Sequence, residues 1–108
     1  MKPKHYHVYT VLLDECVAGF AKVRRLNPER NPALPCLYVG MTGLTPEERF
    51  KNHMEGHKSS GWVHKYGLKL VYALTEGLNP MTYKEAVLME VILAEELRER
   101  GYTVVGGH

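Results

Sequence analysis

Two capping motifs determine where helices can begin in this chain. The segment TPEE at 45–48 joins an N-cap threonine to a proline at the first helical position and to a glutamate three residues after the cap. The segment TYKE at 82–85 has the same capping pattern. We therefore expect a helix over about residues 46–55 and a longer helix over about residues 83–100, each followed by a glycine that ends it.

Three further segments have the β-branched and aromatic content typical of strands. They are residues 6–13 (YHVYTVLL), 36–40 (CLYVG) and 67–75 (GLKLVYALT). The order strand, strand, helix, strand, helix predicts an α+β fold with a small three-stranded, mainly antiparallel sheet flanked by helices. Residues 102–105 (YTVV) add either a short strand or coil. Residues 15–35 lose the pattern and contain several prolines, so we expect a long basic loop there.

Length and composition point to one ordinary globular domain. The 108 residues leave room for one core, so the domain should span residues 1–108. Apolar residues make up 44% of the chain and charged residues 24%, which argues against disordered and fibrous classes. The N-terminal segment predicts no signal peptide, and no stretch approaches the roughly 18 apolar residues of a membrane span. We expect a soluble cytoplasmic protein with no membrane partner.

Cysteine and histidine give weak signals for metal binding. Cys16 and Cys36 form no CxxC pair and are expected to be reduced thiols. His5 and His7 alternate onto one side of the first strand and could ligate zinc. An N-terminal histidine pair is, however, more often a solvated strand end.

Basic residues gather in two segments of the chain. One holds Lys22, Arg24, Arg25 and Arg30, and the other holds Lys51, Lys58, Lys65 and Lys69. The net charge of +2 is by itself weak evidence for an anionic partner. Trp62, within the second segment, could stack on a base or anchor the core or its rim.

The longer predicted helix carries a carboxylate inside its apolar face. On a 3.6-residue period this face consists of Ala86, Met89, Leu93, Ala94 and Leu97, and Glu90 lies within it. Burying an ionised carboxylate without partners costs several kcal/mol. Glu90 is therefore paired with a basic side chain, bound to a metal ion or placed at the rim of a cleft. The pattern supports the paired and the functional interpretations equally.

Four segments in order resemble the GIY-YIG nuclease domain. They are HVYTVLL, LYVGMTG, PEERFKNH and EAVLMEVIL, and the resemblance runs from the first strand to the end of the long helix. Tyr9 lies in HVY, which stands for GIY, and Tyr38 lies in YVG, which stands for YIG. Arg49 and His53 follow on the shorter helix, where four-residue spacing puts them on one face. Glu90 stands where the family has its metal-binding glutamate.

Three departures from the family pattern stand out. His7 replaces the first glycine of GIY, and the connection over residues 15–35 is longer than the usual hairpin. Many members also have an asparagine after the long helix, and no asparagine follows Glu90 in this chain. His108 could stand in for it.

The resemblance implies an endonuclease that hydrolyses DNA with one Mg²⁺ or Mn²⁺ ion held by Glu90. Arg49 would neutralise charge on the phosphate oxygens, and Tyr38 would be the general base, with Tyr9 and His53 beside it. A phenol has an ordinary pKa of about 10, so something must lower the pKa of Tyr38.

DNA is the implied partner, with backbone contacts from Arg24, Arg25, Lys58 and Lys65. Sequence preference would require a separate specificity protein. Two other interpretations remain. The chain could be a catalytically silent nucleic-acid-binding or interaction module with the same fold. It could also be an unrelated small domain, in which the two tyrosines are packing aromatics, Arg49 and His53 lie on a solvated helix face, and Arg49 is far from Glu90.

Overall fold

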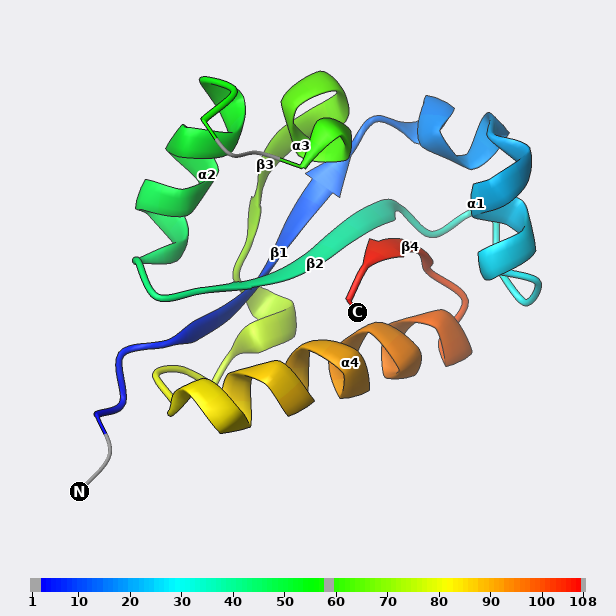
Figure 1. Ribbon diagram of the computed structural model, residues 1–108. Coiled ribbons are helices and arrows are strands. Elements are labelled where there is room, and N and C mark those ends of the chain that lie inside the picture. Colours follow the sequence, from blue (N-terminus) through cyan, green and yellow to red (C-terminus); the bar gives the residue numbers. More distant parts are fainter. Residues whose placement is uncertain (1–2, 58–59, 108) are drawn as a thin grey trace.

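Four strands form one mixed sheet in the order β3-β1-β2-β4 (Figure 1). They are β1 (His7–Leu13), β2 (Cys36–Thr42), β3 (Gly67–Val71) and β4 (Thr103–Gly106). Strand β1 pairs antiparallel with β2 and β3, whereas β4 runs parallel to β2. The computed structural model describes residues 3–57 and 60–107.

The α+β class is confirmed, but the expected three-stranded sheet is wrong in strand number. The C-terminal segment pairs through Thr103–Gly106 with β2 and gives the sheet its parallel edge. Val104 and Val105 are both buried, each on a different face of the sheet. A four-residue strand is too short for its alternation to be distinguished from coil in the sequence.

Both capping boxes are present where the sequence places them. Thr45 and Glu48 open α2 (Pro46–Met54), and Thr82 and Glu85 open α4 (Tyr83–Glu99). The remaining helical segments are α1 (Ala21–Leu26), α3 (Gly61–Tyr66) and the 3₁₀ turns η1 (Glu15–Gly19) and η2 (Ala73–Thr75). The expected strand over residues 67–75 therefore ends at Val71. No helix of the described residues is long and apolar enough to cross a membrane.

The segment 15–35 is not the long loop that its sequence suggests. It contains η1 and α1, which bury Val17 and Val23 against the sheet. Asn27 attaches it to the edge strand: its Oδ1 accepts from the Val104 N–H (2.8 Å) and its Nδ2 donates to the Val104 carbonyl (3.0 Å). The amide thus takes the place of a neighbouring strand. A helix of six residues is too short to show a clear apolar period.

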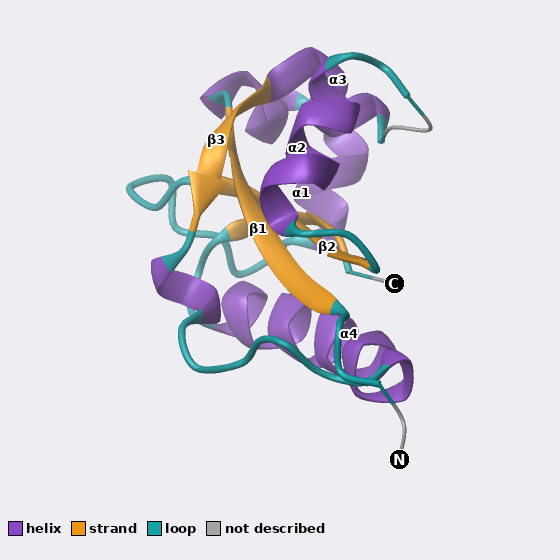
Figure 2. Ribbon diagram, turned by 90° about the vertical axis from the view of Figure 1, so that its left-hand side faces the viewer, coloured by secondary structure: helices purple, strands orange, loops and turns teal. Residues whose placement is uncertain are grey.

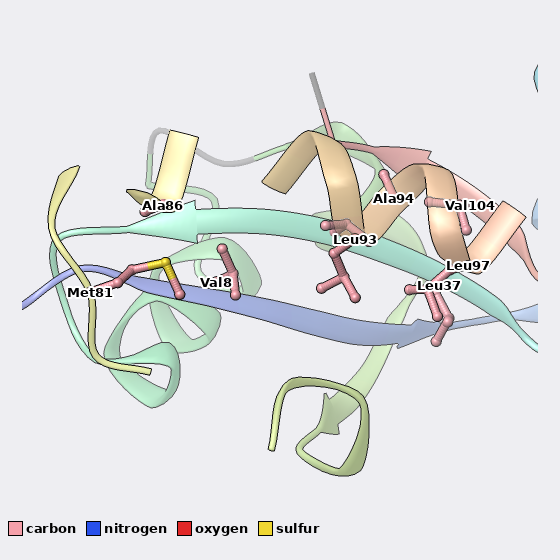
Figure 3. Packing of buried hydrophobic residues seen from close by; sticks show 9 residues of the cluster. Val8, Leu37, Met81, Ala86, Leu93, Ala94, Leu97 and Val104 are labelled. Carbon is pink, nitrogen blue, oxygen red and sulfur yellow. The ribbon is translucent and has the colours of Figure 1, made fainter. Parts of the chain in front are cut away.

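The helices cover both faces of the sheet. Helix α4 lies along one face, and α2 and α3 lie on the other (Figures 1 and 2). Alternation along β1 sends Val8 toward α4, where it joins the core cluster drawn in Figure 3. The same alternation sends Tyr9, Val11 and Leu13 to the opposite face, into a second core with residues of η1, α1 and α3.

Candidate active site

Tyr9 and Tyr38 lie side by side on the sheet face that α2 and α3 cover. Tyr9 on β1 is opposite Gly40 on β2, which places Tyr38 diagonally next to it, with ring centroids 6.2 Å apart. A Cβ atom at Gly40 would lie 2.6 Å from the Tyr9 hydroxyl oxygen and 2.8 Å from Cε2 of Tyr38. The glycine of YVG therefore leaves the space in which the two rings meet.

His53 links the tyrosine pair to the loop before α3. This side chain is fully buried, and its Nδ1 accepts from the Ser60 backbone N–H at 3.1 Å. Because Nδ1 is an acceptor, a neutral ring carries its proton on Nε2, which then donates to the Tyr9 hydroxyl at 2.8 Å. Burial, and then the charge of Arg49, lower the pKa of His53 to about 4. His53 is accordingly neutral at physiological pH and fixes the position of Tyr9.

Arg49 lies one helical turn before His53 and is half-buried. Its Nη1 donates to the carbonyl of His57 at 3.5 Å. Its charge also favours the ionised forms of both Tyr9 and Tyr38 and the neutral form of His53. The expected common face of Arg49 and His53 is therefore directed at the tyrosine pair, not at solvent.

Glu90 lies on helix α4, on the other side of the sheet, and its charge acts on the same two hydroxyl groups. It occupies the face that buries Ala86, Leu93 and Ala94, as the sequence predicts, and is itself half-buried. Its negative charge raises the pKa of both Tyr9 and Tyr38. The charges of Glu90 and Arg49 thus act on one pair of hydroxyl groups.

The pKa of Tyr38 is raised overall, contrary to the lowering expected of a general base, although three neighbouring groups favour its phenolate. Burial is the largest effect and raises its pKa. A hydrogen bond from the Ser60 side chain lowers it, as do the charge of Arg49 and a hydrogen bond with Tyr9. Tyr9 is more deeply buried, and burial followed by the neighbouring Tyr38 raises its pKa well above the ordinary value. Of the two phenols, Tyr38 is therefore the one whose proton is more easily removed.

The C-terminal glycines form part of the wall of the site, which the sequence did not indicate. Gly106 has a positive φ of 80°, and a Cβ there would lie 2.9 Å from Cε1 of Tyr38. Gly107 packs directly on Ala94 of α4, one turn after Glu90, and its N–H donates to the Val39 carbonyl at 3.0 Å. Paired glycines after a strand signal such close backbone approach. His108, the expected substitute for the family asparagine, lies outside the described residues.

The expected DNA-contacting residues are spread over two helices. Arg24 and Arg25 are exposed on α1, where Nη1 of Arg24 donates to the Gly19 carbonyl at 2.8 Å. Lys65 is exposed on α3. Lys58 lies outside the described residues.

The zinc and cysteine expectations have different outcomes. Within residues 3–57 and 60–107, no group of three or more His, Cys, Asp or Glu side chains is placed to hold a metal ion, so the zinc interpretation of His5 and His7 has no support. Cys16 and Cys36 are free thiols, as expected. The pKa of Cys16 is raised chiefly by its interaction with Asp14, and that of Cys36 by burial.

A cleft opens beside Tyr38. It has a volume of about 630 Å³ and is lined by Ser60, Trp62 and Lys22 together with residues of β4 and α4. A larger cavity of about 910 Å³ lies around Cys16 and Cys36. Its wall includes none of Tyr9, Tyr38, Arg49 and Glu90. Because Tyr38 and Ser60 line the smaller cleft, we regard that cleft as the candidate substrate site.

Comparison with known proteins gives no relative: no family model, no curated protein and no solved structure matches this chain.

Proposed function

We propose that this protein is a metal-dependent endonuclease of the GIY-YIG type, which hydrolyses phosphodiester bonds of DNA. The observation that carries the proposal is that Tyr9 and Tyr38 lie side by side and that the charges of Arg49 and Glu90, on helices at opposite faces of the sheet, both act on their hydroxyl groups. A guanidinium, a carboxylate and two phenols at one point supply an anion-binding group, a metal ligand and a proton acceptor.

Glu90 would hold one Mg²⁺ or Mn²⁺ ion. Hard divalent cations of this kind bind through one or two carboxylates, substrate phosphate oxygens and water, so a single protein carboxylate fits the requirement. When bound, the ion would supply positive charge to the phosphate oxygens. Glu90 is half-buried, and its negative charge disfavours ionisation of the Tyr9 and Tyr38 hydroxyls. A bound cation would offset that charge, so the carboxylate suits a cation site.

In the proposed reaction, the oxygen of a water molecule forms a bond to phosphorus, the bond from phosphorus to the leaving sugar oxygen breaks, and that oxygen takes a proton from solvent water. The water proton passes to Tyr38, which acts as a phenolate. Arg49, Ser60 and Tyr9 all favour that ionised form. The charge of Glu90 disfavours the phenolate of Tyr38, and a cation held by the carboxylate would remove this effect. His53, held neutral, keeps Tyr9 in place without competing for the proton.

Arg49 would bind the non-bridging oxygens as negative charge develops on them. Its planar guanidinium can donate two parallel hydrogen bonds to a phosphate, which an ammonium group cannot. The exposed basic residues of α1 and α3, including Arg24, Arg25 and Lys65, would contact the backbone of the strand without reading sequence.

The silent-module interpretation rests on two features of the sequence. His7 replaces a family glycine, and no asparagine follows Glu90. The joint action of Arg49 and Glu90 on Tyr38 favours the enzyme, because a binding module has no need of a metal ligand and a proton acceptor at one place.

The proposal is tested by conversion of supercoiled plasmid to the nicked and linear forms. We expect the wild type to cut in Mg²⁺ or Mn²⁺ and EDTA to stop it. Tyr38→Phe keeps the ring and removes the proton acceptor, so it should cut at least about 100-fold more slowly, while still binding DNA. Equal lack of activity of wild type and Tyr38→Phe across metals and DNA structures would favour the silent module.

A further inference from the structure

Three aromatic side chains form an exposed cluster next to the cleft beside Tyr38. They are Phe20, Trp62 and Tyr66, and we call them the aromatic platform. The ring of Phe20 stands edge-on to Trp62 with centroids 5.4 Å apart, and Trp62 and Tyr66 lie 5.9 Å apart. Phe20 is 40% exposed, and the other two are partly exposed. Their outer surfaces are thus available to a flat ligand.

Positive charge accompanies the aromatic platform. The Lys22 ammonium lies 5.1 Å from the centre of the Trp62 ring, and Lys65 lines the same shallow pocket. The pocket has a volume of about 340 Å³, within the range of roughly 300 to 1,000 Å³ typical of small-ligand sites. Aromatic faces beside lysines match the two parts of a nucleotide, a base and a phosphate.

The pocket and the cleft are neighbours on the surface. Lys22 and Trp62 line both of them, and the cleft continues to Ser60 and Tyr38. Arg98 adds a further cation to the wall of the cleft. A strand whose phosphate lies at Tyr38 could therefore extend along basic side chains and bring a neighbouring base to the aromatic platform.

We propose that the aromatic platform stacks on an unpaired base of the DNA strand near the phosphate that is cut, so that the protein prefers substrates with single-stranded segments. This inference rests on the nuclease function proposed above. A base within a duplex is already stacked on its neighbours and cannot present its face to Trp62. The stacking of a base on an aromatic ring is stronger than a single exposed lysine–ring contact, so a base can displace Lys22 from the ring. The lysine is then free to pair with phosphate.

Intrinsic fluorescence tests the contact directly, because Trp62 is the one tryptophan in the sequence. The probe is a fluorescence titration of the full-length protein in EDTA with a short single-stranded oligonucleotide and with the matching blunt duplex. Binding is followed in parallel by anisotropy of labelled DNA. We expect single-stranded DNA to quench the Trp62 emission and the duplex to leave it nearly unchanged.

Three variants separate stacking from charge. Trp62→Leu keeps apolar volume and should weaken binding of single-stranded DNA by roughly 5- to 150-fold, the range measured for loss of one stacked base. Phe20→Ala changes an exposed ring and leaves the probe in place, so it should reduce both affinity and quenching. Lys84→Met is the charge control: it removes one positive charge from the exposed start of α4 and should leave the preference for single strands intact. Circular dichroism checks that each variant is folded.

The outcomes separate this inference from the nuclease proposal. Single-stranded DNA that binds by anisotropy without quenching Trp62, or that binds a folded Trp62→Leu variant as tightly as the wild type, would overturn the platform and leave the nuclease proposal standing. Quenching without plasmid cleavage would support the platform and refute the nuclease. The absence of any DNA binding would refute both.

Discussion

Gly40→Ala tests whether the two tyrosines meet where the structure places them. The added methyl carbon would lie 2.7 Å from Cζ of Tyr9 and 2.8 Å from Cε2 of Tyr38. An ordinary carbon–carbon contact is roughly 3.5 Å, so each ring must recede by about 0.7 to 0.8 Å. Gly40 does not have a positive φ, so alanine meets no backbone strain there and the cost is steric.

Two effects of different size follow from this displacement. Overpacking of this kind costs about 1 to 3 kcal/mol of the free energy of unfolding, which corresponds to a fall in Tm of roughly 5 to 20 °C for a domain of this length. Displacement of reacting groups by nearly 1 Å costs about 100-fold in rate. We therefore expect Gly40→Ala to be folded at 25 °C and to cut plasmid DNA about 100-fold more slowly.

The assay compares thermal unfolding by circular dichroism with the initial rate of plasmid nicking. Gly19→Ala is the matched control, because a Cβ at Gly19 meets nothing within 4 Å among the described residues. If Gly40→Ala matched Gly19→Ala in both Tm and rate, the close approach of the two tyrosine rings to Gly40 would be refuted.

Three further predictions concern other parts of the site and fold. Arg49→Lys keeps the charge but not the planar guanidinium, so we expect a lower kcat, about 10-fold or more, with little change in DNA affinity; an unchanged kcat in single-turnover cleavage would remove Arg49 from the reaction. Asn27→Leu leaves the N–H and carbonyl of Val104 without their buried partners, so the free energy of unfolding in urea should fall by about 2 to 4 kcal/mol; a loss below 0.5 kcal/mol would show that Asn27 does not hold residues 15–35 to the sheet. His53 has a folded pKa of about 4, below the roughly 6.5 of an unfolded histidine. As pH falls from 6.5 toward 4 the unfolded chain binds this proton first, so stability should drop by about 3 kcal/mol over that range. In a titration of Tm against pH, His53→Gln should lose this part of the slope, and an equal slope in both proteins would contradict the burial of a neutral His53.

Local signals in the sequence were sufficient for the parts of the fold that have strong short-range chemistry. The two capping boxes place α2 and α4 correctly because each motif satisfies backbone N–H groups at a helix start whatever the rest of the chain does. The 3.6-residue period likewise puts Glu90 on the buried face of α4.

Elements that depend on distant contacts were missed or misjudged. Strand β4 exists because α4 returns the chain alongside β2, and α1 is docked by the buried amide of Asn27. Helix α3 follows directly from the Ser60 cap, whose side chain accepts from the Trp62 N–H. Six-residue helices and four-residue strands have too few residues to show a period, and their stability comes from tertiary packing.

The residues of the candidate site likewise divide into those that local sequence signals indicate and those that only tertiary contacts bring to the site. The sequence places Tyr9 and Tyr38 on the expected strands and Arg49 and Glu90 on the expected helices, and strand register then brings the two tyrosines side by side. Ser60 was not anticipated as a site residue, because its contacts with His53 and Tyr38 arise from the turn between α2 and α3. A serine two residues before Trp62 is a recognisable helix cap but gives no indication of a nearby histidine.

The most direct test of the central claim compares Glu90→Gln with Glu95→Gln in a titration of plasmid cleavage against Mg²⁺. Both substitutions remove one carboxylate from α4, but the half-buried Glu90 acts electrostatically on the tyrosine hydroxyls, whereas Glu95 is exposed. We predict that Glu95→Gln retains the cleavage rate and Mg²⁺ dependence of the wild type, whereas Glu90→Gln shows no Mg²⁺-dependent cleavage. Equal Mg²⁺-dependent cleavage by all three proteins would show that the metal acts elsewhere or that the activity belongs to a contaminant, and the proposed site would be wrong.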